Sequence, residues 1–74
     1  MCHVMKFTPT KDPRKVQRIL QASAALVQDG KAEEELNWDP NSPWHNSKYT
    51  DLETGFQWVV YLPDHAFPGE VKVI

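Results

Sequence analysis

The stretch "DPRKVQRILQASAALVQDG", from Asp12 to Gly30, decides the fold of this 74-residue chain. Asp12 is a good helix N-cap, because its carboxylate can accept hydrogen bonds from the free N–H groups of the first turn, and proline suits the first helical position. Side chains that favour burial then recur at three- and four-residue spacing, which predicts one stripe on the helix: Val16, Ile19, Leu20, Ser23, Leu26 and Val27. Gly30 supplies a left-handed stop. We therefore predict an amphipathic helix over residues 13–29.

Strand patterns lie on both sides of this helix. Residues 1–9 alternate as a short strand does, and Pro9 ends the pattern because proline cannot donate to a β-ladder. Residues 56–62 give the strongest strand pattern, with one apolar face formed by Phe56, Trp58, Val60 and Leu62. The opposite face is also largely apolar, which predicts a central position in the sheet. Residues 70–74 follow a Pro-Gly turn and predict an antiparallel hairpin with 56–62.

The middle of the chain leaves more than one structure open. Residues 31–36, "KAEEEL", suit either one more helical turn or the start of an extended segment. "NWDPNSPWHNSKYT", residues 37–50, has two prolines, two tryptophans and no apolar period, which predicts an ordered aromatic loop. Residues 49–52 are a candidate fourth strand. The expected fold is a single α+β domain over residues 1–74, with the order β-α-(loop)-β-β and one helix packed on a mostly antiparallel sheet of three strands, or four.

Composition limits the class of protein. A hydrophobic content of 41% argues against wholesale disorder. Cys2 is the only cysteine, so the chain has no internal disulfide, which suits a reducing compartment. No apolar run approaches the roughly 20 residues that span a bilayer, and the N-terminus has no secretory pattern. We expect a cytoplasmic protein without a membrane segment, whose small core favours a homodimer or a stable partner.

Residues suited to catalysis or metal binding are scattered. Cys2 and His3 are adjacent near the chain terminus, whereas His45 and His65 lie far along the sequence, and no pair resembles an activated nucleophile with its base. Structural zinc sites need pairs of ligands a few residues apart, and this spacing is missing. We expect no enzyme, no metal site and no cofactor.

The aromatic loop and the acids near it are the candidates for partner binding. Tryptophan and tyrosine dominate the energy of many interfaces, so we expect Trp44 and Tyr49, with His45, to anchor a protein partner. The acids would suit a basic partner surface: Glu33, Glu34, Glu35 and Asp39. We expect Trp38 to pack inward and Trp44 to lie nearer the surface. The simpler alternative is that both rings complete a small core and that the acids are a solvated helix end.

A basic cluster at the start of the helix is a second candidate site: Lys11, Arg14, Lys15 and Arg18. Positive charge there opposes the helix dipole, and a bound phosphate or carboxylate would compensate it. Neutralisation by the chain's own acids would also compensate it, and a solvated helix face is the favoured single interpretation. The net charge of −2 and the pI near 5.8 disfavour a general nucleic-acid binder.

These observations together favour a small non-enzymatic protein-binding module, an inhibitor or regulator that blocks a surface of its partner. Nucleic-acid or phosphate-ligand binding through the basic cluster is the alternative function.

Overall fold

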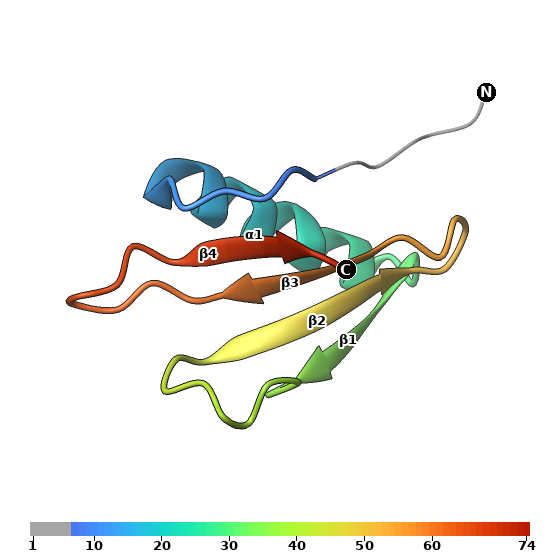
Figure 1. The fold of residues 1–74 in the computed structure, drawn as a ribbon. Helices are drawn as coiled ribbons and strands as arrows, with labels where there is room; N and C mark the ends of the chain where they lie inside the picture. The colour runs from blue at the N-terminus through green and yellow to red at the C-terminus, as the bar shows by residue number, and fades with distance from the viewer. Residues whose placement is uncertain (1–6) are drawn as a thin grey trace.

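The computed structural model describes residues 7–74, which form one helix and four strands (Figure 1). The helix comes first and the strands follow: α1 Pro13–Gln28, β1 Ala32–Leu36, β2 Asn46–Asp51, β3 Gln57–Tyr61 and β4 Glu70–Val73. Each strand pairs antiparallel with its sequence neighbour, so the sheet order is β1-β2-β3-β4. The predicted α+β class is confirmed. Within residues 7–74, all four strands follow the helix.

The strand predicted for residues 1–9 falls mostly outside the described residues, which begin at Phe7. Residues 7–9 have no strand geometry. The chain instead meets the sheet at Thr10, whose N–H donates to the Val71 carbonyl at 3.1 Å and whose carbonyl accepts from the Val71 N–H at 2.8 Å. Thr10 is the first residue after Pro9 that has an N–H to donate, which explains why pairing is seen here.

The helix α1 has the ends that its sequence predicts. The Asp12 carboxylate accepts a hydrogen bond from the Arg14 N–H at 2.9 Å, and Pro13 is the first helical residue. At the other end, Gly30 has a φ of 74°, and the next residue, Lys31, donates its N–H to the Leu26 carbonyl at 2.8 Å. This is the Schellman arrangement that glycine permits. The observed helix therefore ends one residue before the predicted end, with residue 29 as its C-cap.

The core lies between α1 and the inner face of the sheet. Trp58 on β3 is fully buried, and its Nε1–H donates to the Ser23 hydroxyl at 2.8 Å. That hydroxyl donates in turn to the Ile19 carbonyl at 2.7 Å, so both polar groups are satisfied inside the core. Further buried residues pack around this centre: Val16, Ala32, Tyr49, Val60 and Val71. Trp58 and Val60, on the predicted apolar face of residues 56–62, share this core with Val16 of the helix, and β3 lies between two strands as expected.

Two segments of the middle region are strands. Residues 31–36 were open between helix and extended structure, and β1 resolves the alternative in favour of a strand. The aromatic loop predicted for residues 37–50 is too long, because residues 46–50 belong to β2. β2 pairs with strands on both sides, so tertiary pairing overrides the turn-forming composition of "NSKYT". The candidate fourth strand at residues 49–52 overlaps the last three residues of β2.

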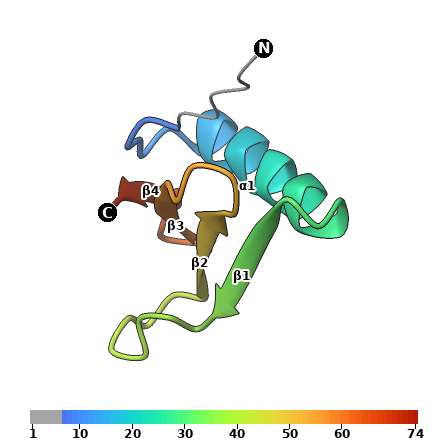
Figure 2. The ribbon, with the colours of Figure 1, turned by 90° about the vertical axis from the view of Figure 1, so that its right-hand side faces the viewer.

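The helix covers β1 at one end only. Figure 2 shows β1 running away from the C-terminal end of α1. Its first residue, Ala32, is buried, while the four residues that follow are exposed. The end of β1 and the loop after it therefore project beyond the helix. Within residues 7–74, no helix combines the length and the apolar character that crossing a membrane requires.

Candidate partner-binding groove

The loop over residues 37–45 is ordered by one buried side chain at the start of β2. The Asn46 amide oxygen accepts from the Asp39 N–H at 2.8 Å. Its amide nitrogen donates to the carbonyls of Asp39 and Trp44, both at 3.0 Å. One asparagine side chain therefore fixes the loop backbone at two points.

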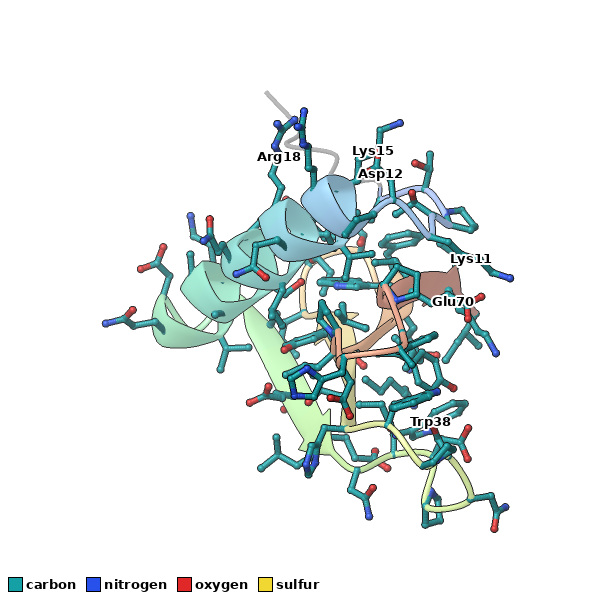
Figure 3. All side chains as sticks on the ribbon, turned by 90° about the vertical axis from the view of Figure 1, so that its left-hand side faces the viewer. Lys11, Asp12, Lys15, Arg18, Trp38 and Glu70 are labelled. Carbon is teal, nitrogen blue, oxygen red and sulfur yellow. The ribbon has the colours of Figure 1, made fainter. Side chains whose placement is uncertain are left out.

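Of the two loop tryptophans, Trp38 is the more exposed, which is the reverse of the expected order. Trp44 is half-buried and stacks on Phe67, with ring centroids 4.7 Å apart and an interplanar angle of 5°. Trp38, labelled in Figure 3, is 38% exposed. Its ring centroid lies 5.9 Å from the Lys48 ammonium. The prediction that Trp38 packs inward is wrong. The reason is that Trp38 packs against Lys48, which alternation with the buried Tyr49 places on the face of the sheet away from the helix.

An open groove lies where the helix leaves the sheet uncovered. Its volume is about 420 Å³, and its walls come from α1, β1, β2 and the segment after β3. Three leucines supply the apolar part of the lining, and three residues add titratable groups: Leu20, Leu36, Leu62, Glu34, His45 and Tyr49. Leu36 is 73% exposed, so its side chain is open to solvent at the wall of this hollow. We call this hollow the leucine groove.

A second hollow of about 330 Å³ adjoins the leucine groove. It is lined by the Trp44 region and by the residues that follow β3, Pro63 and Asp64. His45 and Leu62 line both hollows, so the two form one continuous surface. The hollow beside Trp44 and the leucine groove therefore meet at His45 and Leu62.

A hydrogen bond links the edge strand to the floor of the leucine groove. The Tyr49 hydroxyl donates to the Glu34 carboxylate at 2.9 Å. Burial raises the pKa of Tyr49 to about 12, and the hydrogen bond to Glu34 and its negative charge act in the same direction. Tyr49 is therefore a neutral hydrogen-bond donor at ordinary pH, and it holds Glu34 at the wall of the groove.

The sheet separates the remaining acids from this groove. Alternation along β1 places Glu33 and Glu35 on the face opposite Glu34. Asp39 accepts a hydrogen bond from the Tyr61 hydroxyl at 3.0 Å, which, after burial, is the next cause that raises the pKa of Tyr61 to about 12. The acids were predicted to form one surface. Instead, Glu34 lies on the helix side of the sheet, while Glu33 and Glu35 lie on the other side of the same edge strand.

The basic cluster lies elsewhere on the molecule. Its four residues are all exposed, and Figure 3 shows Lys15 and Arg18 pointing away from the sheet, at the opposite end from Trp38. The helix N-terminus beside them is already capped by Asp12. Among residues 7–74, no three histidine, cysteine, aspartate or glutamate side chains group as metal ligands would.

The apolar lining was not predicted from the sequence. Leu36 ends an acidic run, and Leu20 belongs to a helix stripe that was assigned wholly to the core. Phe67, the stacking partner of Trp44, lies in a segment interpreted only as a turn. The one feature of the sequence that could have indicated this lining was Leu36, an apolar residue at the end of the glutamate-rich stretch. In a strand, Leu36 lies on the opposite face from Glu35.

Comparison of the chain with protein-family models, with curated proteins and with solved structures gives no match.

Proposed function

We propose that this chain is a non-enzymatic, cytoplasmic protein-binding module that inhibits or regulates a partner by covering part of its surface. The observation that carries the proposal is the leucine groove, with Leu36 exposed at its wall and the Trp44 hollow continuous with it. Contact surfaces commonly have an apolar and aromatic centre with polar groups around it. This groove has that arrangement.

The chemistry of the lining supports a protein partner. Leucine side chains and a stacked indole offer area that an apolar side chain of the partner can cover, and burying such a side chain is worth roughly 1.5–3 kcal/mol. His45 and Glu34 add hydrogen-bonding groups that can select orientation. Trp44 and His45 thus remain the proposed anchors, and Leu36 joins them. Tyr49 was predicted as a third anchor, but its side chain is buried in the core, and it acts only by holding Glu34 at the groove. Asp39 and the other two glutamates form the acidic rim.

The experiment compares two exposed leucines. Leu36 is at the groove, whereas Leu52, which is 53% exposed, follows β2 and does not line it. Immobilised wild-type protein, Leu36→Glu and Leu52→Glu are incubated with extracts of cells that express the protein. We expect one set of proteins to be retained by wild type and by Leu52→Glu but not by Leu36→Glu.

Each outcome has a clear meaning once folding is checked by circular dichroism. Equal retention by all three proteins would contradict the proposal, as would retention lost equally in both variants. A second groove variant, Trp44→Ala, should reduce the retention of the same proteins.

The basic cluster remains the second candidate, because all four of its side chains are exposed on one end of the helix. A phosphate or nucleic-acid ligand would contact Lys11, Arg14, Lys15 and Arg18. Replacing Arg14 and Arg18 with glutamate should then abolish retention on heparin or immobilised nucleic acid. Under the favoured function, that double variant keeps the retention of protein partners.

A further inference from the structure

The outer edge of β1 can be located from the two ends of its ladder with β2. At one end the Leu52 N–H donates to the Lys31 carbonyl at 3.0 Å, and at the other the Asn37 N–H donates to the Asn46 carbonyl at 2.8 Å. In an antiparallel pair, hydrogen-bonded and non-hydrogen-bonded positions alternate. Every second residue counted from these ends therefore bonds to β2, and the residues between them direct their N–H and C=O groups outward.

Two exposed residues of β1 carry these outward groups. Glu33 and Glu35 bond to β2 by this count, so Glu34 and Leu36 each present one N–H and one C=O away from the sheet. Within residues 7–74, no hydrogen bond is formed by those outward groups. Such a row is a template on which another extended chain can pair.

The side chains of the same two residues line the leucine groove. A strand added beside β1 would therefore alternate between two environments. Its residues on the helix side would enter the groove next to Leu36, and its residues on the other side would lie next to Glu33 and Glu35. The open edge and the groove thus form one continuous surface with a two-residue period.

We propose that the partner contributes an extended segment that adds to β1 as a fifth strand and in which basic residues alternate with apolar ones. The inference rests on the proposed function and names the chemistry of its partner. The apolar side chains occupy the leucine groove, while lysine or arginine side chains lie beside Glu33 and Glu35. Backbone hydrogen bonds supply affinity, and the alternating side chains supply specificity.

Charge selects this occupant over a second copy of the chain. Two β1 strands paired about a two-fold axis, with all five residues overlapping, would place Glu34 against Glu34 and Glu33 against Glu35. Like charges directly opposite each other on paired strands are destabilising. Across β2, Glu33 faces the uncharged Thr50 and Glu35 faces Lys48, so the edge keeps a negative balance that a basic strand would complement.

The test uses heptapeptides with blocked ends, followed by amide NMR of the whole protein. One peptide alternates lysine and valine, a second alternates glutamate and valine, and a third has the lysine–valine composition without alternation. A fourth peptide has the sequence of the first, but every second backbone amide carries an N-methyl group, which removes the hydrogen-bond donors along one side of the extended peptide. We expect only the first to bind, and we expect it to slow hydrogen exchange at the Glu34 and Leu36 amides but not at Glu33 and Glu35, which already bond to β2.

Variants of β1 separate the contributions of backbone and charge. Leu36→Pro removes one outward N–H, whereas Leu36→Ala keeps it, and proline is tolerated where an edge N–H faces solvent. We expect affinity for the first peptide to fall more for the proline variant than for the alanine variant. Glu33→Gln with Glu35→Gln should weaken binding by roughly tenfold. Added salt should weaken the wild-type complex and affect the double variant less.

The outcomes distinguish the inference from the function on which it rests. If the N-methylated or the non-alternating peptide binds as tightly as the first, strand addition is overturned. If no peptide binds while protein retention still depends on Leu36, the proposed function stands and this inference fails. If retention does not depend on Leu36 either, both fail.

Discussion

The two edges of the sheet, β1 and β4, are protected in different ways. On β4, Val71 is fully buried and exchanges two backbone hydrogen bonds with Thr10. On β1, the residues after Ala32 are exposed, and the outward groups of Glu34 and Leu36 have no partner within residues 7–74. The chain itself covers the β4 edge at Val71, whereas the β1 edge is exposed over four residues, three of which are glutamates.

This difference between the edges suggests that β4 contributes to the stability of the fold and that β1 is available for recognition of another chain. An edge that is covered contributes buried area and backbone hydrogen bonds to folding. An edge guarded by glutamates repels a second copy of itself but leaves its hydrogen-bonding groups available to a strand of opposite charge. Changes at β4 should therefore alter stability, while changes at β1 should alter association.

The glycines that precede the two edge strands give the largest expected contrast. Gly69 has a φ of 90°, and a Cβ there would lie 2.8 Å from Val16 Cγ1 and 3.1 Å from the Tyr61 carbonyl oxygen. Gly30 has a φ of 74°, but a Cβ there would meet nothing within 4 Å. We expect Gly69→Ala to lower the free energy of unfolding by about 3 kcal/mol, from backbone strain and overpacking, and Gly30→Ala by about 1 kcal/mol from strain alone.

Denaturant unfolding followed by tryptophan fluorescence measures both glycine variants. Equal losses at the two positions would mean that the start of β4 is not as closely packed against α1 as the structure shows.

Truncation of one apolar residue on each edge should give the next largest difference. Val71→Ala removes two fully buried methyl groups and should cost about 2 kcal/mol. Leu36→Ala shortens a side chain that is 73% exposed and should change stability by less than about 0.5 kcal/mol. The same unfolding experiment tests the pair. A large loss in Leu36→Ala would mean that the leucine completes the core and is not a recognition residue.

The sequence predicted those parts of the fold that depend on local chemistry. Asp12 and Gly30 bound the helix closely because capping acts through neighbouring backbone groups. β3 was identified because β-branched and aromatic residues occupy both of its faces. β1 was left open between helix and strand, since three consecutive glutamates favour neither state and only pairing with β2 decides it.

The site was harder to predict because it depends on contacts between distant segments. Trp44 stacks on a phenylalanine 23 positions along the chain, a pairing that no local pattern contains. Trp38 was expected in the core, but it lies in the loop after β1, beyond the end of the helix, and is 38% exposed. Leu36 became a candidate only when the direction of β1 relative to α1 was known. Composition indicates that rings and acids are present, and the fold determines which of them meet.

Removing the charges that guard β1 should make this edge behave as an unprotected one. We expect the triple variant Glu33→Thr, Glu34→Gln, Glu35→Thr to self-associate, because threonine favours strands and like-charge repulsion is lost. Its effect on monomer stability should be below about 1 kcal/mol. Sedimentation velocity over a range of concentrations measures the association. Glu70→Thr on β4 is the control and should leave the sedimentation unchanged, because Thr10 already pairs with that edge.

The last prediction concerns the pH dependence of stability that arises from the hydrogen bond between Tyr49 and Glu34. The pKa of Tyr49 is about 12 in the folded chain and 10.0 in its unperturbed state, so the unfolded chain loses this proton first as the pH rises. The stabilising contribution is fully present below pH 10 and is lost between pH 10 and about 12. The Tyr61 hydroxyl, which donates to Asp39, should contribute a loss over the same range.

Glu34→Gln separates the two tyrosines. It removes a negative charge from beside Tyr49 while leaving an amide oxygen that can accept the hydrogen bond, so the pKa of Tyr49 should fall but stay above 10, because burial is the largest cause of the shift. The pKa of Tyr61 should not change, since its acidic neighbours are Asp39 and Glu70. Ultraviolet titration of the wild type, Glu34→Gln and Glu34→Gln with Tyr61→Phe assigns each transition. A fall in the Tyr61 pKa instead would mean that Glu34 acts across the sheet, and the separation of its two faces would be lost.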